Sequence, residues 1–358
     1  MANGKEVLLR VENLCQYFKL DANTVNKAVD NVSFNIHKGE VFGLVGESGC
    51  GKTTTGRSII KLYDITSGSV YFKNQRICAG TKAYEDAIAA AKKEKRTCKD
   101  PERIAELDAI IAKNKAEIKS AKADHKKADR KLVNEIQMIF QDPIASLDPR
   151  MTVRDIIAEG LVIKGIKDKE YIDNKVFEML ETVGLVREHA SRYPHEFSGG
   201  QRQRIGVARS LVMEPSLIIA DEPISALDVS IRAQIINLLN DLRNTLGITI
   251  LFIAHDLSVV KYFSDRIGVM YYGKMVELAE SEELFKHPMH PYTRSLLSAI
   301  PQPDPTYEKN RKRIVYNPIA DHDYRNDAPT FREVTPGHFV LCNDEECARY
   351  VKQAEEEA

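Results

Sequence analysis

The sequence lacks long hydrophobic runs. A membrane-spanning helix needs roughly 20 consecutive, mostly apolar residues, and the apolar runs here, such as residues 248–254, are much shorter. We therefore expect a chain that docks on a membrane if it works at one, instead of crossing it. The first residues, Met-Ala-Asn-Gly-Lys-Glu, also lack the apolar stretch of a signal peptide, so we expect a protein that stays on the cytoplasmic side.

The sequence also lacks a large net charge and a cysteine framework. Its 51 basic and 52 acidic residues give a net charge of −1, so bulk electrostatics give no sign of nucleic acid binding. The six cysteines are scattered, which suits a reducing cytosol better than a set of disulfides. With 358 residues, of which 43% are hydrophobic and 29% charged, the chain allows one large globular domain or two.

A phosphate-binding loop is the first motif that is present. Residues 46–53 read Gly-Glu-Ser-Gly-Cys-Gly-Lys-Thr, the form G-x-x-x-x-G-K-S/T, between a buried strand predicted at 41–45 and a helix predicted from Lys52. Lys52 would reach the β- and γ-phosphates and the Thr53 hydroxyl would ligate Mg²⁺. Three glycines can turn successive N–H groups inward around a phosphate; they are Gly46, Gly49 and Gly51. A glycine-rich turn that binds nothing is the disfavoured alternative.

Polar side chains also follow two apolar runs. Residues 217–220 precede Asp221 and Glu222, and residues 248–254 precede His255. Continuous apolar runs are typical of strands covered on both faces, so we expect a parallel sheet with flanking helices. At these strand ends Asp221 would hold Mg²⁺ through its water shell, Glu222 would polarise the attacking water, and His255 would bond the γ-phosphate. Taken singly, each group has a structural alternative: a turn cap or an ordinary strand-end histidine.

A further candidate and a signature segment complete the pattern. Gln141 follows a strand predicted at 135–140 and would bind Mg²⁺ and the water, although a lone Gln-Asp-Pro is usually only a turn. Residues 197–201 read Phe-Ser-Gly-Gly-Gln, about 150 residues after the phosphate loop. The phosphate loop, this segment and Asp221-Glu222, in this order, indicate an ATP-binding cassette.

Residues 79–133 differ in character from their surroundings. From 81 to 132 there is no glycine, and Ala, Lys, Glu and Asp dominate, which indicates two helices broken near residues 98–101. Asp100 would be the N-cap and Pro101 the first helical residue of the second. One narrow apolar stripe is expected; it consists of Ile104, Leu107, Ile110, Ile111 and Ile118. We expect a charged helical hairpin that projects from the domain, and a disordered charged linker is the alternative.

The order of these motifs resembles the nucleotide-binding subunit of an ABC transporter over about residues 7–300. The matching positions are the phosphate loop, Gln141, 198–201, Asp221-Glu222, 225–228 and His255. Finer features resemble the oligopeptide and dipeptide importer ATPases; they lie at 141–150, 197–204 and 287–293. Gln201 and the following residues 205–209 are closer to the F-type subunit than to its D-type partner.

The resemblance implies two such domains facing head to tail with ATP between them. The implied ATP-binding residues are Phe18, Gly46, Glu47, Ser48, Gly49, Cys50, Gly51, Lys52, Thr53, Thr54, Ser198, Gly199, Gly200 and Gln201. The implied catalytic residues are Glu222, His255 and Gln141, and the implied Mg²⁺ ligands are Thr53, Gln141 and Asp221. Ser198, Gly199 and Gly200 would contact the γ-phosphate held by the partner subunit, and Asp228 would lie at the interface. Phe18 matches the aromatic that stacks on adenine, with Tyr17 as second candidate and core packing as the alternative role of Phe18.

The implied fold is α/β: a P-loop ATPase core with a mixed sheet, an ABC helical subdomain, an inserted helical hairpin and a loop-rich C-terminal extension. The ABC domain would span 1–300, with the hairpin at 79–133 and the helical signature subdomain at 142–215, and the extension would span 301–358. The implied cofactors are ATP and Mg²⁺. The implied partners are a D-type ATPase subunit, two transmembrane permease subunits and, through the complex, an extracellular peptide-binding protein, without nucleic acid. The site of action would be the cytoplasmic face of the cell membrane.

Some features depart from the family, and other function classes stay open. The hairpin is absent from the usual family pattern. Many members carry a cysteine-rich C-terminal segment that resembles an iron–sulfur site, but here only Cys342 and Cys347 fall in the tail. Because a cluster needs four thiolates, we expect two buried or idle thiols and no cluster from this chain alone. DNA-repair and chromosome-maintenance ATPases also carry hairpins inside an ABC head, although theirs run much longer. ABC translation factors carry two cassettes per chain. Importers of nickel or glutathione share the present pattern, so the solute stays open.

Overall fold

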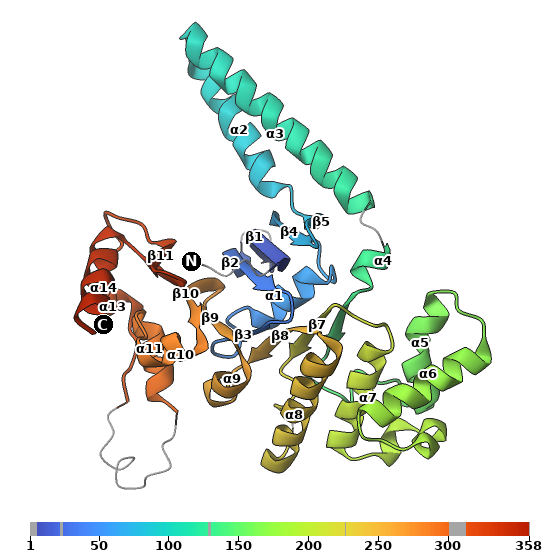
Figure 1. The fold of residues 1–358 in the computed structure, drawn as a ribbon. Coiled ribbons are helices and arrows are strands. Elements are labelled where there is room, and N and C mark those ends of the chain that lie inside the picture. The colour runs from blue at the N-terminus through green and yellow to red at the C-terminus, as the bar shows by residue number, and fades with distance from the viewer. Residues whose placement is uncertain (1–5, 22–23, 128–129, 226, 301–312, 358) are drawn as a thin grey trace. The chain divides into compact units, whose positions relative to one another are not determined.

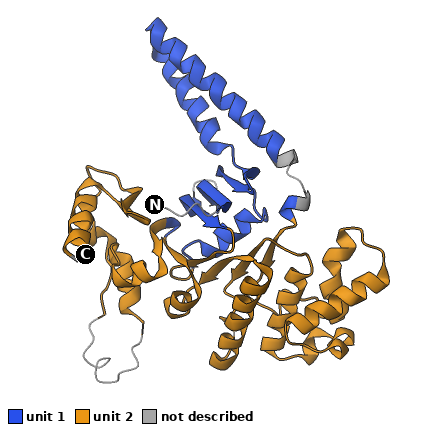
Figure 2. Ribbon diagram, in the orientation of Figure 1, with its two compact units in different colours: residues 1–37, 49–133, 272–274 blue, residues 38–48, 134–271, 275–358 orange. Residues whose placement is uncertain are grey.

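Figure 1 shows the fold of the chain in a computed structural model. The structure describes residues 6–21, 24–127, 130–225, 227–300 and 313–357. The chain divides into two compact units, which Figure 2 distinguishes by colour. The first unit comprises residues 1–37, 49–133 and 272–274, and the second comprises residues 38–48, 134–271 and 275–358.

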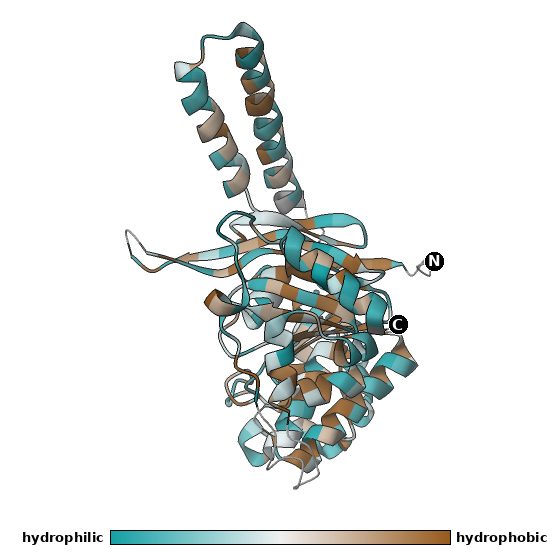
Figure 3. Ribbon diagram, turned by 90° about the vertical axis from the view of Figure 1, so that its left-hand side faces the viewer, coloured by the Kyte–Doolittle hydropathy of each residue, from teal (hydrophilic) through white to brown (hydrophobic). Residues whose placement is uncertain are grey.

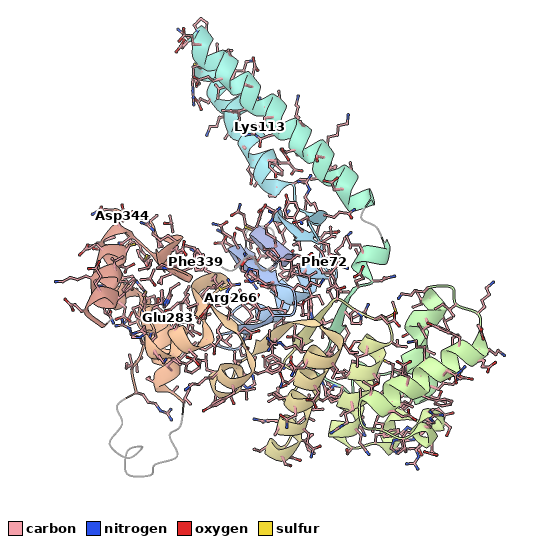
Figure 4. The ribbon with its side chains drawn as sticks, in the orientation of Figure 1. Phe72, Lys113, Arg266, Glu283, Phe339 and Asp344 are labelled. Atoms are coloured by element: carbon pink, nitrogen blue, oxygen red, sulfur yellow. The ribbon has the colours of Figure 1, made fainter. Side chains whose placement is uncertain are left out.

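The first unit contains a four-stranded sheet in the order β2-β1-β4-β5, in which every neighbouring pair is antiparallel. Its strands are β1 (Val7–Lys19), β2 (Val25–His37), β4 (Ser67–Phe72) and β5 (Gln75–Ala79). Side chains such as Leu9, Val70 and Phe72 are fully buried beneath this sheet, and Figure 4 labels Phe72. Helix α1 (Lys52–Ile59) belongs to the same unit and begins directly after the phosphate loop.

The helical hairpin predicted for residues 79–133 consists of α2 (Lys82–Thr97) and α3 (Pro101–Lys127), followed by α4 (Arg130–Val133). As expected, Asp100 caps α3, because its Oδ1 accepts a hydrogen bond from the Glu102 N–H at 3.0 Å. The apolar stripe is narrower than predicted: Leu107 is 1% exposed, whereas Ile110 is 38% exposed. Ala91 and Ala121, which the stripe had not included, are buried instead.

The second unit contains an eight-stranded sheet in the order β11-β12-β10-β9-β3-β8-β7-β6. Five neighbouring strands run parallel: β9 (Arg266–Tyr271), β3 (Val41–Val45), β8 (Thr249–Ala254), β7 (Leu217–Asp221) and β6 (Ile136–Ile139). Every residue of β3, β7 and β8 is buried, which confirms the strands expected from the apolar runs. Because β12 pairs antiparallel with β10 and β11, the sheet as a whole is mixed.

The helices of the second unit fall into two groups. Within residues 142–215, three helices pack on one another: α5 (Val153–Ile163), α6 (Lys169–Thr182) and α7 (Gly199–Leu211). The short 3-10 helices Arg187–Ser191 and Pro194–Glu196 lie between α6 and α7. The helices α8 (Val229–Leu246) and α9 (Leu257–Phe263) follow β7 and β8. Among the described residues, no helix combines the length and the apolar character that crossing a bilayer requires.

The C-terminal part is more regular than the loop-rich extension that we expected. After β10 (Lys274–Glu280) come α10 (Ser281–Lys286), α11 (Pro291–Ser298), α13 (Pro318–Asp321), β11 (Thr330–Thr335), β12 (His338–Cys342) and α14 (Asp344–Glu357). Strand β12 pairs with β10 in the main sheet, and Glu277, fully buried in β10, lies 2.7 Å from His338 Nε2. Figure 4 labels Phe339 on β12 and Asp344 at the start of α14. Residues 301–312 of the predicted extension lie outside the described residues.

Candidate functional site

The carboxyl ends of four parallel strands carry the predicted site residues of the second unit. Gly46 follows β3 and Gln141 lies just beyond β6. Asp221 ends β7, and His255 follows β8. Because β3, β8, β7 and β6 are successive parallel neighbours, these residues share one edge of the sheet. In open α/β sheets this edge is where ligands bind.

Glu222 is the centre of this group. Its Oε2 accepts a hydrogen bond from Gln141 Nε2 at 3.0 Å, and His255 Nδ1 lies 3.2 Å from the same oxygen. The Glu222 side chain is 12% exposed, so its carboxylate is largely shielded from solvent, whereas His255 is 53% exposed. The structure therefore brings together all three residues that the sequence predicts to be catalytic.

The backbone at Glu222 is held in a rarely used conformation. Its φ is +43°, in the left-handed region, where a non-glycine residue typically costs about 1–3 kcal/mol. The Glu222 N–H donates to the Ile253 carbonyl of β8 at 2.9 Å, and Ser225 donates its hydroxyl to the Glu222 carbonyl at 3.1 Å. These bonds hold the strained residue in place, as is common at catalytic sites. Ser225 belongs to the motif at 225–228, but the sequence did not indicate this supporting role.

A small cavity lies beside Glu222. Its volume is about 10 Å³, close to the smallest space that holds one water molecule. Glu222, Ser225, Arg232, His255 and Asp256 are among the residues that line it. A carboxylate and an imidazole thus border a space of the size of a single water.

The donor set at this edge suits a hard divalent cation. Asp221 is completely buried at the end of β7 and offers a carboxylate, and Gln141 offers an amide oxygen. Oxygen ligands of these kinds, with few carboxylates, are what Mg²⁺ takes up when it also binds phosphates.

The phosphate loop adopts the backbone that its glycines predict. Gly46, Gly49 and Gly51 have φ values of +151°, +81° and +105°. At Gly49 an added Cβ would meet no atom within 4 Å, so the left-handed backbone, and not crowding, is what calls for glycine there. Glu47 and Ser48 are exposed between these turns, and the chain passes from the second unit to the first after Ser48.

The second half of the loop leads into α1 in the first unit. Gly51 is the N-cap of α1 and provides no capping side chain. Lys52 is only 4% exposed, and its Nζ lies 3.8 Å from Cys50 Sγ. Burial raises the pKa of the Cys50 thiol, which keeps this cysteine neutral at physiological pH. Thr53 and Thr54 follow in the first turn and are half-buried.

Tyr292 is a residue of the phosphate loop region that the sequence did not reveal. Its hydroxyl accepts a hydrogen bond from the Glu47 N–H at 3.1 Å, and the side chain, on α11, is only 2% exposed. Its ring also packs against Tyr271 with 4.4 Å between the centroids. Tyr292 lies within the segment 287–293 that carried the family resemblance, but no spacing or motif connects it to Glu47, 245 residues earlier.

The signature residues form a separate group at the start of α7. Ser198 is the N-cap: its Oγ accepts from the Gln201 N–H at 3.4 Å, and its own N–H donates to Gln201 Oε1 at 3.1 Å. Ser198 and Gly199 are exposed. A Cβ at Gly200 would come within 2.6 Å of Ile231 Cγ2 on α8, so this glycine is required by close packing. The exposed start of α7 can therefore receive an anion from outside.

The adenine candidates lie on β1 in the first unit. Phe18 is half-buried, and its ring packs edge-on against Tyr63 with 5.3 Å between the centroids. The Tyr17 hydroxyl hydrogen-bonds Asp30, and burial together with this bond raises the pKa of Tyr17. Lys27 lies over the Tyr17 ring, 5.3 Å from its centroid. Because Tyr17 is already engaged by Lys27 and Asp30, Phe18 stays the first candidate.

Replacement of Phe18 by alanine is expected to weaken ATP binding by about 1 kcal/mol, the scale of stacking on one aromatic ring, and to weaken ADP equally. Titration calorimetry with both nucleotides measures this effect. Tyr17→Ala is the comparison variant, and a larger loss of affinity there than in Phe18→Ala would move the assignment to Tyr17.

Comparison with known proteins finds two matching family models and several similar solved structures. The family model described as "ABC transporter" matches residues 29–107 and 106–225, and the model "Oligopeptide/dipeptide transporter, C-terminal region" matches residues 276–325. Among solved structures, the dimeric post-hydrolysis state of the ATP-binding cassette MJ0796 with ADP and Pi is 26% identical, with a TM-score of 0.57 over 76% of this chain and 99% of that one. The cassette cbiO1 from Clostridium perfringens is 25% identical, with a TM-score of 0.56 over 79% and 92%.

Curated relatives resemble the chain over nearly its full length. The oligopeptide transport ATP-binding protein OppF of Bacillus subtilis is 53% identical over 95% of this chain and 98% of its own length. The dipeptide transport ATP-binding protein DppF of Lactococcus lactis is 47% identical over 99% of both chains. On this identity and the two model matches, the chain belongs to the ABC transporter family, among the oligopeptide and dipeptide transport ATP-binding proteins.

Proposed function

We propose that this chain is the ATP-hydrolysing subunit that powers import of oligopeptides or dipeptides across the bacterial cell membrane. The observation that carries the proposal is the convergence of Gln141 and His255 on the Glu222 carboxylate at the edge of the sheet where the phosphate loop begins. The names of the full-length relatives favour peptides over nickel or glutathione as the solute. The family match likewise favours an importer over a DNA-repair ATPase.

In this proposal the residues divide the binding and the chemistry between them. The N–H groups of the loop at 46–51 and the Lys52 ammonium bind the phosphates of ATP. Thr53, Gln141 and, through its water shell, Asp221 would hold Mg²⁺, which would neutralise charge on the phosphates. Glu222 accepts a proton from the attacking water and orients it, and Gln141 and His255 keep the Glu222 carboxylate in place.

The proposal places a second cassette across the nucleotide. Ser198, Gly199 and Gly200 at the exposed start of α7 complete the γ-phosphate shell of the partner subunit, a D-type paralogue, and Asp228 lies in the interface. When the pair closes around ATP, the region near Gln141 transmits the movement to two permease subunits. The permease subunits receive peptide from an extracellular binding protein. The chain thus acts at the cytoplasmic face, bound peripherally. The dimeric cassettes among the solved structures support this arrangement.

Ser198→Arg is expected to block hydrolysis of the nucleotide bound to the partner while ATP binding by the chain itself persists. The long arginine side chain would occupy the place of the γ-phosphate. The substitution also removes the Ser198 hydroxyl that caps α7. Single-turnover hydrolysis by the purified pair measures the loss of activity at the partner's nucleotide. Sedimentation with and without ATP measures whether the two subunits still associate.

Thr152→Arg is the matched control, because Thr152 is the N-cap of α5 and lies outside the site. Both variants lose a cap, worth about 1 kcal/mol, and only the change at Ser198 should stop hydrolysis. If the two subunits stay monomeric at saturating ATP and the wild-type subunits still hydrolyse ATP normally, the shared site is ruled out.

A further inference from the structure

The hairpin α2–α3 has no part in the site described above, and it carries a surplus of positive charge. Residues 79–133 contain 15 lysines and arginines but only 10 aspartates and glutamates, whereas the whole chain contains 51 and 52. The hairpin is therefore basic on a chain that is otherwise acidic. Figure 3 shows hydrophilic residues along both helices, interrupted by short hydrophobic stretches.

Most acidic side chains of the hairpin are engaged in ion pairs. Asp86 pairs with Lys82, Asp108 with Lys95, and Glu94 and Glu106 with Arg103. Two more acidic residues of α3, Glu117 and Asp124, face Arg76 of β5, where Asp124 Oδ2 accepts from Arg76 at 2.6 Å. The pairs with Arg76 attach α3 to the sheet, and the six pairs together engage most of the acidic side chains of the hairpin.

Lysines on another side of α3 stay without an ion pair among the described residues. Lys115, Lys119 and Lys122 are exposed and follow one another at intervals of four and three residues. At 3.6 residues per turn this spacing aligns them on one face, roughly 160° or more around the helix from Glu117 and Asp124. Lys113, labelled in Figure 4, and Lys92 and Lys93 on α2 add exposed positive charge.

We propose that the face of Lys115, Lys119 and Lys122 docks on a membrane surface of anionic phospholipid headgroups. The inference rests on the proposed function in that it needs the chain to work at a membrane. Screening limits the reach of surface charge to about 8 Å at physiological ionic strength, so a lipid surface beside α3 senses these lysines and not the net charge of the chain. Clusters of four to eight Lys or Arg on a helix are the sequence pattern of such contacts, and together with Lys92, Lys93 and Lys113 these lysines make six exposed ones on the hairpin.

The composition of the face favours lipid over a protein partner. Energetically dominant residues of protein interfaces are mostly Trp, Tyr and Arg. This face has none of them, and its lysines alternate with small residues such as Ala112, Ala116 and Ala123. A strongly hydrated ammonium suits diffuse attraction to a charged surface, whereas the planar guanidinium suits fixed bidentate contacts. The isoleucines that flank this face, Ile111 and Ile118, are half-buried, so the contact is electrostatic and involves no insertion.

The test is sedimentation of the full chain with vesicles of phosphatidylglycerol and phosphatidylcholine. We expect binding that rises with the phosphatidylglycerol fraction, falls steeply with salt, and is negligible on pure phosphatidylcholine. In a variant with Lys115→Gln, Lys119→Gln and Lys122→Gln the affinity should fall about 100-fold, about five-fold for each lysine near the surface. ATPase activity should stay unchanged, because these residues lie outside the nucleotide site.

A variant with Lys167→Gln, Lys169→Gln and Lys274→Gln removes equal charge from exposed positions outside the hairpin and should bind vesicles like the wild type. Equal binding of both triple variants, or equal binding to both lipids, would overturn the proposal. A further test is chemical acetylation of Lys115, Lys119 and Lys122. If the detergent-solubilised partner subunits protect these lysines and vesicles do not, the face is a protein contact and the proposal is wrong. Each of these results leaves the proposed function standing as long as hydrolysis and peptide uptake persist.

Discussion

Glu222→Gln is expected to leave ATP binding intact and to lower ATP hydrolysis at this site by roughly 10²–10⁴-fold, the usual contribution of a positioned general base. The amide keeps the shape of the side chain and can still bond Gln141, but it cannot accept a proton from water. The Glu222 carboxylate is the group on which Gln141 and His255 converge, at 3.0 and 3.2 Å. Single-turnover hydrolysis, measured in a pair whose other site is inactive, prevents the partner from masking the loss.

Glu214→Gln is the matched control for this experiment. Glu214 also has a left-handed backbone, with a φ of +52°, but it is exposed and bonds Lys175 outside the site. Its replacement should leave the rate unchanged. Wild-type turnover in Glu222→Gln, with ATP binding preserved, would show that Glu222 is not the base.

Lys52→Ala is expected to lower the affinity for ATP roughly 10- to 100-fold, because a hydrogen bond to a charged group contributes about 1.5–3 kcal/mol. Lys52 supplies the one side-chain cation of the phosphate loop, and its side chain is already buried at the start of α1. The Lys52 side chain therefore loses little conformational freedom when it binds phosphate. Titration calorimetry gives the affinity, and circular dichroism checks that the fold persists.

Lys274→Ala, at an exposed position of the same unit, is the control for loss of one positive charge. It should bind ATP like the wild type. An unchanged affinity in a correctly folded Lys52→Ala variant would contradict the assignment of the phosphate loop.

Much of the fold could be predicted because its signals are local. The apolar runs at 41–45, 217–220 and 249–253 are buried strands, as expected from sequence, and the break at Asp100 separates two helices. The tail could not be predicted in this way. Its prolines indicated loops, but β12 pairs with β10, and His338 of β12 contacts Glu277 of β10, 61 residues earlier in the chain. The burial of 338–342 alternates along β12, but the sequence His-Phe-Val-Leu-Cys does not alternate between polar and apolar residues and so gave no such signal.

The site was predictable to the extent that its residues sit in motifs. Gln141, Asp221, Glu222 and His255 follow strands, and parallel strands bring their ends to one edge. The contact of Tyr292 with Glu47 has no such signal, because it depends on packing between segments far apart in the chain. Likewise, the left-handed backbone of Glu222 follows from its bond to Ile253 of β8 and not from any preference of glutamate.

Uptake of a labelled oligopeptide by the complete importer, reconstituted in lipid vesicles with ATP on the side of this subunit, tests the central claim most directly. The account predicts peptide uptake that requires ATP and that Glu222→Gln abolishes while ATP stays bound. Uptake that continues at the wild-type rate in the variant would contradict the coupling. ATP-dependent uptake of nickel ions or glutathione, without uptake of peptide, would contradict the assignment of the solute.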